Sequence, residues 1–168
     1  MGLIVQCAWC GKTSAGSNGG SHPITHGICP SCADDFEHPS VVLADLLDEF
    51  PEPIFLVDSN ARVQAANRAA CQALGKPERQ VEGRLGGEVI DCAYAELPGG
   101  CGKTVHCDGC TIRNSVKQTW STGIAHCAVT AERPIAGRTG TSRRRFVIST
   151  EKFGKGVLLR IDETSEAP

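Results

Sequence analysis

Eight of the ten cysteines in this 168-residue chain fall into two sets whose spacing indicates metal or redox chemistry. The first set is two C-x-x-C pairs, Cys7 with Cys10 and Cys29 with Cys32, separated by 18 residues. Two such pairs supply four thiolates within the spacing range of structural zinc sites. A segment of about 35 residues buries too little apolar surface to fold unaided, so bound metal would stabilise it. We predict a zinc ribbon here, with the histidines between the pairs outside the ligand set.

The second set places Cys92, Cys101, Cys107 and Cys110 within nineteen residues, CAYAELPGGCGKTVHCDGC. Cys107 and Cys110 form a C-x-x-C at the start of a predicted helix, where first-turn N–H groups and the helix dipole favour thiolates. The Pro-Gly-Gly segment before Cys101 gives the backbone freedom to fold this cysteine back towards them.

Three chemistries fit the second set. Four thiolates could bind a second, structural zinc ion, or they could hold an iron–sulfur cluster, for which four cysteines are the usual ligands. Without metal, the same cysteines could form disulfides on oxidation and act as a thiol switch. His106 could replace one cysteine ligand, most readily Cys92, and it is also the best candidate for an axial haem ligand.

The elements that must position these cysteines follow from hydrophobic periodicity. A connector helix is predicted to begin at Ser40 and to end before Pro51, with apolar residues at helical spacing at Leu43, Leu46, Leu47 and Phe50. Two strands, a short helix, two helical turns, a longer helix and three strands follow, at 54–57, 62–66, 67–74, 77–83, 87–93, 111–122, 125–131, 144–151 and 156–161. This order predicts an α+β domain with an antiparallel sheet.

The segment PIFLVDSNARVQAANRAACQALGKPERQVEG resembles the opening of a PAS domain, and the closing LLRIDET resembles the last strand of that family. The resemblance covers roughly residues 40–164. It implies a five-stranded antiparallel sheet of order 2-1-5-4-3, a ligand pocket between sheet and helices, and signalling by dimerisation through flanking helices. The amino-terminal pairs resemble those fused to some bacterial sensor PAS domains. We therefore divide the chain into a ribbon (1–38), the connector helix (39–52), the PAS domain (53–164) and a tail (165–168).

The second cysteine set is a departure from the generic PAS pattern. By analogy with bacterial oxygen-sensing kinases that carry a cluster in a cysteine-bearing PAS domain, we favour an iron–sulfur cluster over zinc, although the spacing differs. Cys71 and Cys127 are expected to be small core residues, and His126 to lie on a solvated strand face. The arginines at 133, 138 and 143–145 are expected to form a solvated basic hairpin loop.

A net charge of −2 argues against bulk attraction to nucleic acid or membranes. No apolar stretch is long enough for a membrane span, and the amino terminus lacks the pattern of a signal peptide. Cysteine-rich chains in a reducing cytoplasm are better explained by metal than by disulfides. We expect a cytoplasmic protein.

No set of side chains with the pattern of a catalytic site is present, so we expect no enzymatic activity. The hypothesis is a signal-transduction sensor module that acts through protein–protein contacts with a sensor kinase or regulator, as a homodimer. The alternative is a zinc-stabilised dimerisation or interaction adaptor in which both cysteine sets are structural. A less favoured alternative is a transcription-related DNA-binding protein that uses the ribbon and the arginine loop.

Overall fold

The computed structural model describes residues 4–7, 12–14, 24–27, 43 and 45–167, which fall into two compact units, Met1–Val42 and Leu43–Pro168. In the first unit, strands β1 (Ile4–Cys7), β2 (Thr13–Ser14) and β3 (Ile24–Gly27) form a sheet of order β2-β1-β3. Strand β1 is antiparallel to β2 and parallel to β3.

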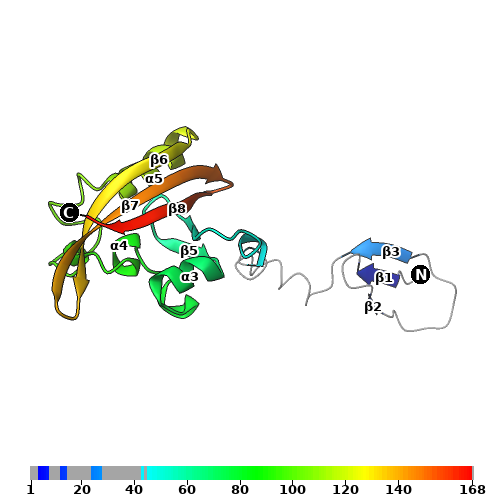
Figure 1. Ribbon diagram of the computed structural model, residues 1–168. Helices are drawn as coiled ribbons and strands as arrows, with labels where there is room; N and C mark the ends of the chain where they lie inside the picture. Colours follow the sequence, from blue (N-terminus) through cyan, green and yellow to red (C-terminus); the bar gives the residue numbers. More distant parts are fainter. Residues whose placement is uncertain (1–3, 8–11, 15–23, 28–42, 44, 168) are drawn as a thin grey trace. The chain divides into compact units, whose positions relative to one another are not determined.

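The second unit contains a five-stranded antiparallel sheet of order β5-β4-β8-β7-β6 (Figure 1). In strand numbers counted within this unit the order is 2-1-5-4-3, which confirms the predicted topology. Residues 43 and 45–47 are helical and precede the sheet. The elements that follow are β4 (Ile54–Val57), β5 (Val63–Ala66), α3 (Arg68–Leu74), η1 (Glu78–Gln80), α4 (Gly86–Val89), η2 (Ala93–Ala95), α5 (Thr111–Thr122), β6 (His126–Gly137), β7 (Gly140–Phe153) and β8 (Gly156–Glu166).

Strand β4 is buried on both faces, which explains its continuous apolar run. On one face, Phe55 and Val57 belong to the main core, with side chains from α3, α4 and α5. On the other face, Ile54 and Leu56 pack with Leu47 of the helical segment. The cysteine-bearing loop from 92 to 110 leads directly into α5, so it lies on the main-core side of the sheet.

Asn67 joins these two sides of the molecule and is fully buried. Its Oδ1 accepts hydrogen bonds from the N–H groups of Ile54 (3.0 Å) and Ala70 (2.9 Å), so it caps α3 and secures β4 together. Its Nδ2 lies 2.8–3.2 Å from three backbone carbonyls at the end of the helical segment, those of Leu47, Phe50 and Glu52. One side chain therefore ties the flanking helix to the sheet and to α3.

The three closing strands are longer than the sequence pattern predicted. Strands β6 and β7 extend to a tight turn at Arg138, so the expected arginine loop is a paired ribbon rather than a loop. The reason is that alternate burial continues beyond the predicted end of β6, with Ala131, Arg133 and Ile135 all buried. The prediction that Arg133 is solvated is therefore wrong.

Two further expectations on β6 are corrected. Cys127 is exposed rather than in the core, because the pairing of β6 with β7 shifts between His126 and Val129 and Ala128 has a positive φ of 52°. His126 is half-buried rather than solvated, and its ring nitrogens lie 3.0 Å from the Oγ1 of Thr119 and from the Oε1 of Gln118. In contrast, Cys71 packs against the main core, as expected.

Among the described residues, no helix combines the length and the apolar character needed to cross a membrane.

Candidate functional site

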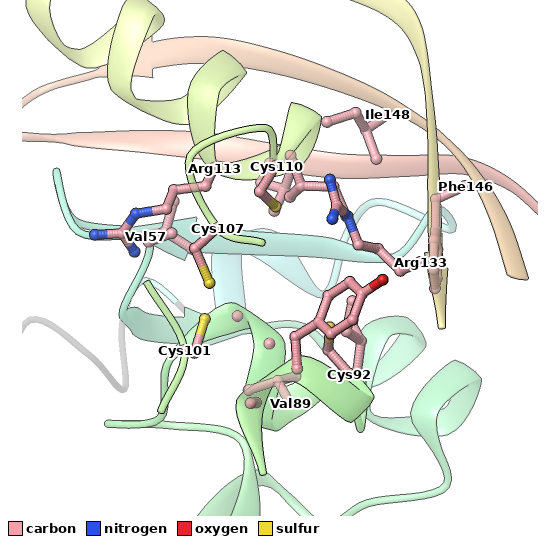
Figure 2. Close-up of a pocket in the computed structure, with 18 of the residues that line it drawn as sticks. Val57, Val89, Cys92, Cys101, Cys107, Cys110, Arg113, Arg133, Phe146 and Ile148 are labelled. Carbon is pink, nitrogen blue, oxygen red and sulfur yellow. The ribbon is translucent and has the colours of Figure 1, made fainter. Parts of the chain in front are cut away.

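A cavity of about 70 Å³ lies between the main-core face of the sheet and the segment that leads into α5 (Figure 2). All four cysteines of the second set line it: Cys92, Cys101, Cys107 and Cys110. Most of the remaining lining is apolar and comes from the strands and from α4, including Val57, Val89, Phe146 and Ile148. The spacing in the sequence thus correctly grouped four residues that the fold brings to one cavity.

Cys92 is buried and is held rigidly at the back of this cavity. Its N–H donates to the carbonyl of Gly87 at 2.8 Å, and it forms an isolated bridge with Ile135 of β6. The preceding Asp91 accepts a hydrogen bond at its backbone carbonyl from the N–H of Ala136, at 2.7 Å. Cys92 is therefore fixed to the sheet, whereas the other three cysteines lie on the loop that follows.

Cys101 occupies space that only a glycine at position 87 leaves free. A Cβ on Gly87 would lie 2.7 Å from the Sγ of Cys101, closer than real contacts allow. In Figure 2 the sulfurs of Cys101 and Cys107 point towards each other. These two thiols form the facing pair of the site.

Cys107 has the surroundings of a thiolate. The N–H of Gly102 donates to its Sγ at 3.1 Å, and the Oγ1 of Thr104 lies 3.2 Å from it. Gly102 adopts a positive φ of 86°, so a residue with a side chain would be strained at the position that supplies this N–H. Burial alone would raise the pKa of Cys107, but these hydrogen bonds and the charge of Arg113 outweigh it, and the pKa lies below its ordinary value.

The other buried thiols shift in the opposite direction. Burial raises the pKa of Cys92, although the charge of Arg133 opposes this effect. Burial also raises the pKa of Cys101, and the proximity of Cys107 and Cys110 adds to the effect. The facing pair therefore combines a thiol whose pKa is lowered with one whose pKa is raised, so Cys107 is the better nucleophile of the two.

Arg133 is a component of the cavity that the sequence reasoning missed. It is 8% exposed, and its Nη2 donates to the carbonyl of Gly109 at 3.1 Å, while its buried Nε has no hydrogen-bond partner. The period of two in Ala131-Arg133-Ile135 was the available signal, because it places Arg133 on the inward face of β6.

His106, the predicted alternative ligand, also lines the cavity, but its ring stacks on Tyr94 with centroids 4.0 Å apart. Within the part of the chain that the structure describes, no three His, Cys, Asp or Glu side chains converge closely enough to hold a metal ion. The four thiols of the second set are the right donors for a cluster or for zinc, but in this arrangement they surround a cavity rather than a single coordination point.

For the first cysteine set, only the backbone of Cys7 is described; Cys10, Cys29 and Cys32 lie outside the described residues. Cys7 ends β1 and pairs with Gly27, the last residue of the parallel strand β3. Gly27 precedes Cys29 by two residues in the sequence.

The arginines of the β6–β7 ribbon differ in their surroundings. Arg143 and Arg145 both form ion pairs with Glu132, at 3.9 Å and 3.0 Å, and Arg133 is buried in the cavity.

Residues 42–107 match the model of a family described as "PAS domain". The match includes Cys92, Cys101 and Cys107 and ends before Cys110 and α5. No curated protein matches the chain.

Several solved structures are similar to this chain at low identity. The PAS domain of an HTR-like protein from Haloarcula marismortui is 18% identical, with 83% of this chain and 100% of that one covered and a TM-score of 0.43. A domain of a sensory box sensor histidine kinase/response regulator from Geobacter sulfurreducens is 16% identical, covering 76% and 96%, with a TM-score of 0.46. The PAS domain of nitrogen regulation protein NR(II) from Vibrio parahaemolyticus is 12% identical, covering 75% and 98%, with a TM-score of 0.44.

Proposed function

We propose that residues 43–167 form a PAS domain, and that it is a non-enzymatic signal-transduction sensor whose input is metal or redox chemistry at the cysteine-lined cavity; the match of residues 42–107 to the PAS family model supports the first part. One observation carries the proposal: the four cysteines of the second set line the same cavity. PAS domains are typically sensory, and reactive or metal-binding thiols at this cavity would give the domain a chemical input.

The path from the cavity to the rest of the domain runs through α5. Its amino-terminal turn follows Cys110 directly, and its carboxyl-terminal half is held on the sheet, where the Oγ1 of Thr119 lies 2.8 Å from the Oγ1 of Thr150. At the same end, the Nε1 of Trp120 donates to the carbonyl of Lys155 at 3.1 Å. A change in the cysteine loop would therefore tilt or strain α5 against β7 and β8, which is the type of shift that PAS-like sensors need.

For the occupant of the cavity, the iron–sulfur cluster remains our first proposal, because four cysteines are its usual donor set. Such a group would supply a one-electron redox couple. Holding it would require the loop to bring the four thiols to a common centre, and the loop carries three glycines with positive φ, Gly99, Gly100 and Gly102. A second zinc would make the loop structural, and a metal-free site would act through the facing pair Cys101 and Cys107.

The first cysteine set is proposed to hold a structural zinc ion. The pairing of Cys7 with Gly27 supports this proposal, because Gly27 lies two residues before Cys29 in the sequence.

The output is proposed to be a contact with a signalling protein, such as a sensor kinase or regulator, made by a homodimer. Leu46 and Phe50 support the dimer, because each is 49% exposed and they lie four residues apart in the flanking segment. Leu47 of the same segment packs on the sheet. This segment therefore has one apolar side that contacts the domain, and a second apolar side, formed by Leu46 and Phe50, that is exposed.

The test is to measure iron, zinc and acid-labile sulfide on protein purified without oxygen, and then to follow the oligomeric state with oxidant, reductant and chelator. We expect one zinc and about two to four irons per chain, lost on Cys107→Ser and retained on the matched control Cys127→Ser, whose thiol is exposed. Two zincs and no iron would favour the interaction adaptor instead. If none of the treatments changes the oligomeric state or partner binding, the sensor proposal is wrong.

A further inference from the structure

We propose that the cysteine-lined cavity, when no metal occupies it, binds a small organic monocarboxylate, held by Arg133 and by the amino terminus of α5. This proposal adds a class of ligand to the proposed function of the same cavity. Binding itself does not depend on that function, but the proposal rests on it for the effect of binding on signalling.

The first observation is the buried charge of Arg133. A guanidinium taken out of water is costly unless it is paired and its N–H groups are satisfied. Arg133 is 8% exposed, one of its nitrogens donates to the carbonyl of Gly109, and its Nε–H is buried without a partner. Among the described residues no Asp or Glu forms an ion pair with it; Glu132, its neighbour in sequence, pairs with Arg143 and Arg145 instead. An anion in the cavity would supply the missing negative charge.

The second observation is independent and concerns α5, a helix of 12 residues. Its N-cap residue Cys110 makes no side-chain capping hydrogen bond. The first N–H groups of a helix have no partner within the helix, and with the helix dipole they favour an anion. Cys110, Ile112 and Arg113 all line the cavity. The bond from Arg133 to Gly109, the residue before Cys110, places the guanidinium at this same end of α5.

Size and polarity select the class of anion. The cavity of about 70 Å³ is the space open to the centres of water molecules, and at about 10–15 Å³ per water in this measure it holds about five to seven of them, which suits an anion with a few heavy atoms. Apart from the thiols, the two arginines, Tyr94 and His106, its walls are apolar, with Val57, Phe146 and Ile148 among them. Arg113 already donates from its Nη1 to the carbonyl of Asn60 at 2.8 Å, which leaves Arg133 as the buried guanidinium with an unpartnered nitrogen. One such group matches the single charge of a monocarboxylate, whereas a phosphate or dicarboxylate would bring a second charge. A short monocarboxylate places its charge on Arg133 and its alkyl group on the apolar side.

The experiment measures binding of propionate to the full chain by calorimetry and by ¹³C NMR of labelled propionate, with propionamide as the uncharged analogue of the same shape. Metal content and free thiols are measured on the same sample. We expect propionate to bind at least tenfold more tightly than propionamide. Arg133→Met should weaken propionate binding by about 10- to 100-fold, since a hydrogen bond to a charged group is lost. Arg133→Lys should retain part of the affinity, and Arg145→Met, on the outside of the ribbon, should leave it unchanged.

Three results would overturn the proposal: no propionate binding, equal binding of propionamide, or an Arg133→Met variant that is folded and binds as well as the parent protein. Preferential binding of nitrate over propionate would overturn the carboxylate assignment. If Arg133→Met does not fold, the comparison of propionate with propionamide on the unmodified chain still decides. Metal content and thiol state are read separately, so a failure here is distinguishable from a failure of the sensor proposal.

Discussion

Asn67→Ala is expected to lower the free energy of unfolding of the second unit, Leu43–Pro168, by about 2–4 kcal/mol and to loosen the flanking helix. The Oδ1 of Asn67 accepts from Ile54 and from Ala70, and the second of these bonds caps α3, a contribution of about 1 kcal/mol. The two amide protons on Nδ2 are shared among three carbonyls. Four hydrogen bonds at about 1 kcal/mol each set the upper value. Water that reaches the half-buried carbonyls of Phe50 and Glu52 accounts for the lower one.

The assay is urea unfolding of the full chain at constant metal content, together with hydrogen exchange at the amides of Glu49 and Phe50. Both amides bond within the helical segment, to the carbonyls of Leu46 and Leu47. The matched control is Asn60→Ala, an exposed asparagine, which we expect to change stability by less than about 0.5 kcal/mol. A loss below about 1 kcal/mol for Asn67→Ala, or unchanged exchange in the helical segment, would refute the role of this side chain as the link between helix and sheet.

Three further outcomes are expected. In chelated, reduced protein, Cys107 should be alkylated faster than Cys101 around pH 7–8, because the lowered pKa of Cys107 gives more thiolate at any given pH. Thr104→Val should shift the pH–rate profile of Cys107 to higher pH. Equal alkylation rates for the two thiols in mass spectrometry would contradict this prediction. Gly87→Ala should displace Cys101 and slow the oxidative formation of a disulfide between Cys101 and Cys107, measured by non-reducing peptide mapping. An unchanged rate would show that disulfide formation does not depend on the space left by Gly87. Leu46→Glu should weaken the dimer in analytical ultracentrifugation. It should lower the free energy of unfolding by no more than about 0.5 kcal/mol, because the side chain of Leu46 is half exposed. An unchanged dimer would place the interface elsewhere.

The element order of the second unit was predictable because each element carries a local signal. Apolar periodicity identified α5 and β4, and turn residues separated the short helices between them. The lengths of β6 and β7 were not predictable in the same way. Their outer halves carry polar and charged residues on the solvent side, and only the pairing of the two strands with each other and with β8 shows that the ribbon continues to Arg138.

The candidate site was predictable as a group of residues but not as a geometry. Four cysteines in nineteen residues indicated a shared role, and the fold does bring them to one cavity. Which thiols face each other depends on tertiary details, such as the missing Cβ of Gly87 and the N–H of Gly102. Arg133 was missed because charge runs are usually solvated, and here the alternation of β6 outweighed that tendency.

The cavity concentrates positive potential from Arg133, Arg113 and the start of α5 on a set of thiols, so ligand binding and thiol chemistry should be coupled. The charge of Arg133 opposes the rise that burial causes in the pKa of Cys92. A carboxylate bound to Arg133 would neutralise the positive charge that lowers the pKa of Cys92. The pKa of Cys92 would then rise further, and its alkylation would be slower. By reciprocity, alkylation of Cys92 with a neutral reagent should change the affinity for propionate. The measurement is the alkylation rate of Cys92 at fixed pH with propionate or propionamide present, and with exposed Cys127 as the internal control. Slowing by propionate at Cys92 alone is expected, whereas equal slowing of both thiols would mean that the two chemistries are not linked through Arg133.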